Sequence, residues 1–112
     1  MSSLESFIER RAVQLILSRL GVTCIKVTPS GTTGWPDRLA IMPDGGVVWI
    51  EFKQPGAQPT PKQNYIHRML RGLGHQVEVC DNALVAVKII EDALRKSIAR
   101  NDSDAAKKVR KR

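Results

Sequence analysis

Residues 34–53 read GWPDRLAIMPDGGVVWIEFK, and this stretch predicts the hairpin around which the fold is organised. Two β-runs flank the segment Met42-Pro43-Asp44-Gly45-Gly46. Proline, aspartate and then a glycine that is free to adopt positive φ suit a three-residue loop with a G1 bulge. We therefore expect an antiparallel hairpin in which Met42 faces Gly46.

The register of this hairpin decides which side chains meet. Counting back from Met42 opposite Gly46 places Asp37 directly opposite Glu51. Strand side chains alternate between the two faces of a sheet, so Lys53 shares the face of Glu51, and Phe52 takes the other. A four-residue loop would instead send Asp37 to the face of Phe52. The turn chemistry thus predicts two carboxylates and an ammonium group on one surface.

Two carboxylates that face each other on a sheet repel, and a hard divalent cation would compensate them. Mg²⁺ typically takes one or two carboxylates and leaves positions for water and substrate phosphate. Lys53 would add positive charge beside that phosphate, while Pro36 starts the strand and fixes the direction of Asp37. The pattern favours phosphodiester hydrolysis with Mg²⁺ or Mn²⁺ and no small-molecule cofactor.

Three segments in this order, Gly34–Arg38, Glu51–Gly56 and the later Gln63, resemble the PD-(D/E)XK nuclease superfamily. The match is to its virus-type replication-repair nuclease (VRR-NUC) branch, and it extends from about residue 5 to residue 90. The resemblance implies an α/β fold with a restriction-endonuclease-like αβββαβα core, in which helices flank a mixed sheet. It also implies that an acidic residue of the first helix assists the metal site.

Glu9 is the first choice for that helix carboxylate. It projects into the apolar arc of a helix predicted over Leu4 to Leu20, where an unpaired carboxylate is costly. The alternatives are a salt bridge at the helix flank or an exposed position. Glu5, one turn earlier, is the other candidate, although a capping box with Ser2 gives it a structural role.

Gln63 has two interpretations. A helix is predicted to begin with Thr60 as N-cap and Pro61 at its first position, so Gln63 can close a capping box with Thr60. The resemblance instead implies that the amide of Gln63 lies near the active centre, where it orients Lys53 or a metal-bound water.

Five side chains are candidate nucleic-acid contacts, each with a structural alternative. The resemblance suggests Lys26 as a second phosphate contact, although strand lysines are often only solvated. Trp35 is either a base-stacking wedge or a packed hydrophobe. The polar loop before it offers hydroxyl groups to a phosphate or is an ordinary connector. These candidates are Lys26, Ser30, Trp35, Lys62 and His67.

The rest of the chain predicts one small domain over residues 1–100. Strands are expected at 22–27 and 76–80, followed by a last helix that ends near Ile98. Residues 101–112 lack apolar periodicity and are predicted to be a disordered basic tail. The net charge is +7, and Lys107–Arg112 contribute five positive charges, so the body is nearly neutral.

Composition narrows the class of protein further. The 112 residues contain no run of membrane-spanning length and no signal peptide pattern at Met1, so the default is a cytoplasmic protein of a bacterium or a phage-infected host. Cys24 and Cys80 match no metal-ligand spacing and are expected to be buried thiols. No serine-protease-like or zinc-ligand pattern is present.

The expected function is that of a metal-dependent, structure-selective endonuclease that cuts branched DNA. Stand-alone VRR-NUC proteins resemble four-way (Holliday) junction resolvases, and a junction with near two-fold symmetry favours a homodimer. A flap, exonucleolytic or nonspecific nuclease is the first alternative. A noncatalytic nucleic-acid-binding or assembly protein on a nuclease fold is the second.

Overall fold

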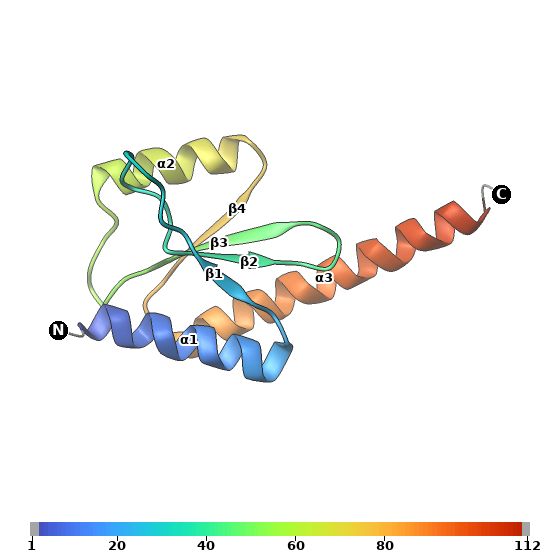
Figure 1. The fold of residues 1–112 in the computed structure, drawn as a ribbon, viewed down its shortest axis with the longest axis horizontal. Helices are drawn as coiled ribbons and strands as arrows, with labels where there is room; N and C mark the ends of the chain where they lie inside the picture. The colour runs from blue at the N-terminus through green and yellow to red at the C-terminus, as the bar shows by residue number, and fades with distance from the viewer. Residues whose placement is uncertain (1–2, 111–112) are drawn as a thin grey trace.

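Three helices enclose one mixed sheet in the computed structural model, which describes residues 3–110 (Figure 1). The strands lie in the order β1-β2-β3-β4, with antiparallel pairing at the first two contacts and parallel pairing between β3 and β4. This is the predicted αβββαβα arrangement. In chain order the elements are α1 (Leu4–Leu20), β1 (Cys24–Lys26), β2 (Arg38–Ile41), β3 (Val47–Phe52), α2 (Pro61–Gly72), β4 (Gln76–Cys80) and α3 (Ala83–Arg110).

The turn between β2 and β3 has the predicted length and register. The Met42 N–H donates to the Gly46 carbonyl at 2.8 Å, and Gly45 adopts a φ of 89°. The ladder therefore pairs Ile41 with Val47 and, at its far end, Arg38 with Ile50. One step further along this register, Asp37 lies opposite Glu51.

The turn is also tied to the last helix through Asp44. Its carboxylate accepts hydrogen bonds from the Ser97 hydroxyl at 2.6 Å, from Arg100 Nε at 2.8 Å and from the Gly46 N–H at 3.0 Å. These bonds, led by that from Ser97, hold the pKa of Asp44 well below its usual range. The hairpin that sets the register is thus anchored at its tip.

Replacing Gly45 by alanine is expected to destabilise the protein by about 1–2 kcal/mol, because an L-residue is strained at this positive φ. A methyl group at Gly45 would meet no atom within 4 Å, so the loss would come from the backbone alone. Gly72→Ala is the matched control. It adds a methyl group in equally open space within α2 and should stabilise the helix slightly. Urea denaturation measures both; equal stability of Gly45→Ala and the parent protein would refute the strained turn.

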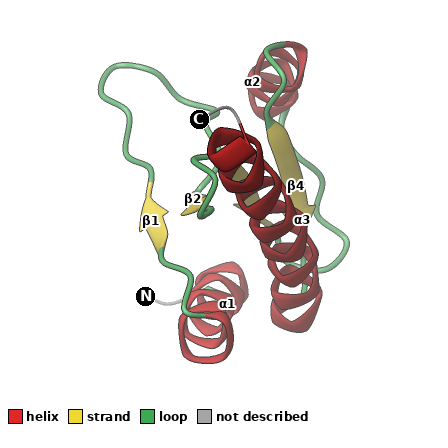
Figure 2. Cartoon of the chain, turned by 90° about the vertical axis from the view of Figure 1, so that its right-hand side faces the viewer, coloured by secondary structure: helices red, strands yellow, loops and turns green. Residues whose placement is uncertain are grey.

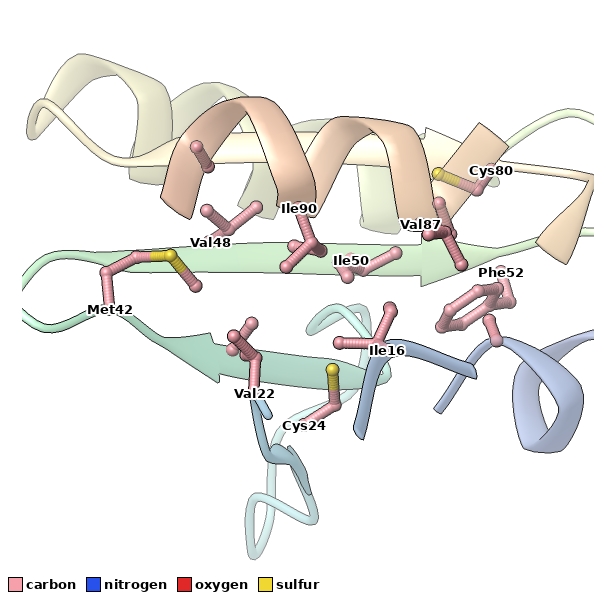
Figure 3. Close-up of a cluster of buried hydrophobic side chains, with 14 of the residues drawn as sticks. Ile16, Val22, Cys24, Met42, Val48, Ile50, Phe52, Cys80, Val87 and Ile90 are labelled. Atoms are coloured by element: carbon pink, nitrogen blue, oxygen red, sulfur yellow. The ribbon is translucent and has the colours of Figure 1, made fainter. Parts of the chain in front are cut away.

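The two faces of β3 have different partners. Val48, Ile50 and Phe52 belong to the main core, with residues of α1 and α3 (Figure 3). Trp49 points the other way, into a smaller cluster with Ile66, Leu70 and Val77 beneath α2. Figure 2 shows α1 and α2 separated by the strands. By alternation, Glu51 and Lys53 lie on the α2 side of the sheet.

Helix α3 corrects the prediction that the chain is disordered beyond residue 100. The helix continues through residue 110 and projects past the sheet (Figure 1). Once a helix is formed, each added residue gains a hydrogen bond without a new nucleation cost, which outweighs the weak propensity of Asn101 to Asp104. The predicted tail residues 111 and 112 lie outside the described residues.

Several smaller features can also be compared with the sequence predictions. Helix α1 takes Ser3 as N-cap, whereas Ser2 of the predicted capping box lies outside the described residues. The first strand is shorter than predicted. Cys24 and Cys80 are buried free thiols, as expected. None of the helices within residues 3–110 combines the length and the apolar character needed to cross a membrane.

Candidate active site

Asp37 and Glu51 come together at the end of the β2–β3 hairpin. The Asp37 Oδ2 atom accepts a hydrogen bond from the Phe52 N–H at 2.7 Å, which holds this carboxylate against β3. Glu51 is only 2% exposed. Burial, and then the charge of Asp37 and a side-chain hydrogen bond with it, raise the pKa of Glu51 to about 8. The two carboxyl groups therefore form one interacting pair, as the turn predicts.

Lys53 supplies a positive charge to this pair. It follows β3, where its backbone N–H donates to the Cys80 carbonyl at 2.9 Å. Its ammonium group opposes the rise in the pKa of Glu51, although burial and Asp37 outweigh it. Lys53 is half-buried, which limits the solvent screening of its charge. The structure thus brings together the three residues on which the predicted chemistry depends.

The side-chain amide of Gln63 closes the predicted capping box and also contacts the candidate site. The Gln63 Oε1 atom accepts from the Thr60 backbone N–H at 2.8 Å, and the Gln63 backbone N–H donates to Thr60 Oγ1 at 3.2 Å, which completes the capping box of α2. Its Nε2 donates to Glu51 Oε2 at 3.2 Å. The cap fixes which end of the amide faces the site. The contact of Gln63 is with Glu51 itself.

His67 is not a surface contact for nucleic acid, which corrects the sequence prediction. It is 1% exposed, and its Nε2 lies 3.6 Å from Glu51 Oε1. Burial, then the charges of Arg71 and Lys53, lower the pKa of His67. With the pKa of Glu51 raised, the two groups meet as neutral partners rather than as an ion pair. The sequence offers one signal for this position of His67. It follows Gln63 by four residues, which places both side chains on one side of a helix.

Glu9 does not join Asp37 and Glu51, which corrects the expectation that it helps to hold the metal. Its carboxylate binds Arg38 Nε at 2.6 Å and Lys26 Nζ at 3.2 Å. Arg38 alternates away from Asp37, so this ion pair lies on the α1 side of the sheet. Two cations explain the burial of Glu9. The same contact places Lys26 with Glu9 and away from the carboxylate pair.

Glu5 lies one turn before Glu9 on α1. It is half-buried in the first turn, and its charge contributes to the raised pKa of Glu51.

Glu9→Gln is expected to leave divalent-cation affinity unchanged and to destabilise the fold by about 1–3 kcal/mol, because it weakens the bond to partly buried Arg38. Glu5→Gln should do the reverse and weaken cation affinity a few-fold. Calorimetric titration and urea denaturation of both variants measure this; a loss of cation affinity in Glu9→Gln alone would contradict it.

The loop before Asp37 packs against the start of α2. A Cβ at Gly34 would lie 2.9 Å from the Lys62 carbonyl oxygen, so only glycine permits this approach. Trp35 packs against Trp49 with ring centroids 5.7 Å apart, as its structural alternative predicts, and its role as a base-stacking wedge stays a prediction. Ser30 and Lys62 are exposed near this junction, and their role as nucleic-acid contacts stays a prediction.

The carboxylate pair fits a divalent cation chemically. Glu51 Oε1 is buried and has no hydrogen-bond partner within the part of the chain that the structure describes. Ionising Glu51 beside Asp37 is unfavourable without added positive charge, which a cation with oxygen ligands would supply. Within residues 3–110, no group of three or more acidic, histidine or cysteine side chains is arranged to hold a metal ion. Protein side chains would therefore provide two ligands, with room for water and phosphate oxygens.

Two known proteins similar to this chain carry names that refer to nucleases. A phage protein named "Putative nuclease p44", from Acyrthosiphon pisum secondary endosymbiont phage 1, is 40% identical over 78 residues, which cover 70% of this chain and 83% of the relative. A solved structure described as a VRR_NUC domain superposes with a TM-score of 0.71 at 28% identity, covering 80% of this chain and 97% of that structure. A comparison with protein-family profiles finds no match.

Proposed function

The chain belongs to the VRR-NUC family of nucleases, and we propose that it uses a divalent cation to hydrolyse phosphodiester bonds within branched DNA. The observation that carries this proposal is the pairing of half-buried Asp37 with buried Glu51 beside Lys53. A protein that only binds DNA gains nothing from two carboxylates held together, since they repel phosphate and each other.

Each residue of the pair has a role in this reaction. Asp37 and Glu51 would hold Mg²⁺ or Mn²⁺, and Gln63 keeps the Glu51 carboxylate oriented through its hydrogen bond to Oε2. When bound, such a cation lowers the pKa of a coordinated water and polarises the scissile phosphate. Lys53 stabilises the negative charge that develops on the phosphate oxygens and helps to position the attacking water. The chain's own nucleophiles are not needed.

Branched DNA is proposed as the substrate on grounds of fold and symmetry. The described residues form one sheet with three helices around a single candidate site, which favours recognition of DNA shape by this domain. A four-way junction has near two-fold symmetry and needs two opposed cuts. A homodimer that presents two sites meets this requirement.

Light scattering at the protein concentration used for cleavage tests the proposed homodimer. A monomer at that concentration would rule out the homodimer.

Lys53→Ala is expected to reduce cleavage of a four-way junction by about 10²–10³-fold while junction binding survives, because the ammonium group acts mainly on the transition state. Labelled junction, flap, single-stranded and linear duplex DNA are compared in Mg²⁺ and in Mn²⁺. Lys88→Ala is the matched control, since this exposed lysine of α3 forms ion pairs with Glu91 and Asp92 of its own helix. Equal cutting of all four substrates would defeat the proposed shape selectivity. No cutting of any substrate would defeat the proposed reaction.

A further inference from the structure

His67 and Glu51 place two buried polar atoms opposite each other without a hydrogen bond between them. Among the described residues, three buried side-chain polar atoms have no hydrogen-bond partner: Trp35 Nε1, Glu51 Oε1 and His67 Nε2. The last two face each other at 3.6 Å. A buried polar group without a partner typically costs about 1–3 kcal/mol, so such pairs rarely persist without a reason.

We propose that His67 is a positioning residue, which donates a hydrogen bond from Nε2 to Glu51 Oε1 and so fixes this carboxylate for divalent-cation binding. The distance exceeds the usual hydrogen-bond range by about 0.5 Å, and a small rotation of the Glu51 side chain closes it. An ionised carboxylate accepts only, so a neutral imidazole with its proton on Nε2 is the complementary partner.

Gln63 and His67 then hold both oxygens of Glu51 from one helix. Gln63 Nε2 already donates to Oε2 at 3.2 Å. Each carboxylate oxygen has two lone pairs, so a hydrogen bond leaves the other free for a cation. The two donors are spaced four residues apart on α2, whose start is capped by Thr60 and whose inner face is packed through Ile66 and Leu70. They are therefore held in place before a cation arrives.

This role differs from that of a buried histidine that only fills space. Groups that orient metal-ligating side chains typically change metal affinity by about 10–100-fold when they are replaced. A space-filling histidine would instead affect stability alone. Because Nε2 has no hydrogen-bond partner among the described residues, an apolar side chain of similar size should be tolerated there.

The test is calorimetric titration of Mn²⁺ into the full chain without DNA, with His67→Leu, His67→Gln and Ile66→Val compared with the parent protein. We expect His67→Leu to weaken Mn²⁺ binding by about 10-fold without loss of cation-free stability, and His67→Gln, which keeps an N–H donor, to restore most of the affinity. Ile66→Val, a change to the same helix face, should leave the affinity unchanged. Equal affinity of His67→Leu and the parent protein, or no recovery in His67→Gln, would overturn the proposal.

A second measurement needs no variant. Nitrogen chemical shifts of His67 in the Mg²⁺-saturated protein should report a neutral ring with its proton on Nε2, and a proton on Nδ1 alone would overturn the proposal. The inference rests on the proposed function only in taking Glu51 as a cation ligand. A parent protein that binds no Mn²⁺ would overturn both, whereas equal binding by His67→Leu would overturn the role of His67 alone.

Discussion

Replacing Glu51 by glutamine is expected to abolish cleavage and, at pH 8, to raise the free energy of unfolding of the cation-free protein. The pKa of Glu51 is raised from 4.5 to about 8, chiefly by burial. Between these values the unfolded chain releases a proton that the folded protein keeps. Stability is therefore lost as the pH rises from 4.5 towards 8. Glutamine has the same shape without the charge, so the gain at pH 8 should be on the order of a few kcal/mol.

The pH window for this measurement follows from His67. Its lowered pKa means that the unfolded chain takes up a proton below the ordinary value of 6.5, which removes stability as the pH falls. The change of stability with pH that His67 causes is opposite in sign to that of Glu51. The effect of Glu51 can therefore be measured separately only above pH 6.5. Urea denaturation in a chelator between pH 6.5 and 8 should therefore show falling stability in the parent protein and a flatter profile in Glu51→Gln.

Glu78→Gln is the control for this experiment, because Glu78 lies half-buried on neighbouring β4. It should retain the slope of the parent protein. A Glu51→Gln variant that is less stable than the parent at pH 8 without cation would show that Glu51 is held by favourable contacts rather than at a cost. In this account, ionised Glu51 destabilises the folded protein until a cation is bound.

Asp37→Asn is expected to reduce cleavage by about a thousandfold or more, because it would remove one of the two proposed anionic ligands of the cation. The asparagine oxygen can still accept from the Phe52 N–H, so the fold should be preserved. DNA binding should be equal or tighter, since a negative charge beside the phosphate is lost. Steady-state cleavage and fluorescence anisotropy with labelled junction DNA measure the two effects.

Asp44→Asn makes the same chemical change at the other end of the hairpin. It breaks the ion pair with Arg100 and should cost stability while cleavage by the folded protein is retained. Comparable loss of cleavage in both variants would mean that the hairpin, rather than the position of Asp37, carries the effect. Undiminished cleavage by Asp37→Asn would remove Asp37 from the reaction.

The hairpin could be predicted from sequence because its determinants are local. Gly45 accepts positive φ, the turn length sets the pairing, and the strand period then assigns Asp37 and Glu51 to one face. The capping role of Gln63 was predictable for the same reason, since Thr60 lies three residues before it. In both cases the deciding contacts lie within a few residues of each other.

The corrected residues depend on partners that are distant along the chain. Helical periodicity showed that Glu9 is buried, but whether a metal or a cationic side chain compensates it depends on Arg38, 29 residues away. His67 occupies the side of α2 that faces the sheet, yet only the register of β3 places Glu51 opposite it. The lack of apolar periodicity beyond residue 100 also placed the end of α3 too early, because a helix that is already formed extends into residues of weak propensity.

Titration of Mn²⁺ into the parent protein, Asp37→Asn and Glu51→Gln tests most directly whether the two carboxylates grip a single cation. We predict one saturable Mn²⁺ site per chain in the parent protein, and its loss in each variant although both stay folded by circular dichroism. Binding of Mn²⁺ by both variants with the affinity of the parent protein would contradict the shared site.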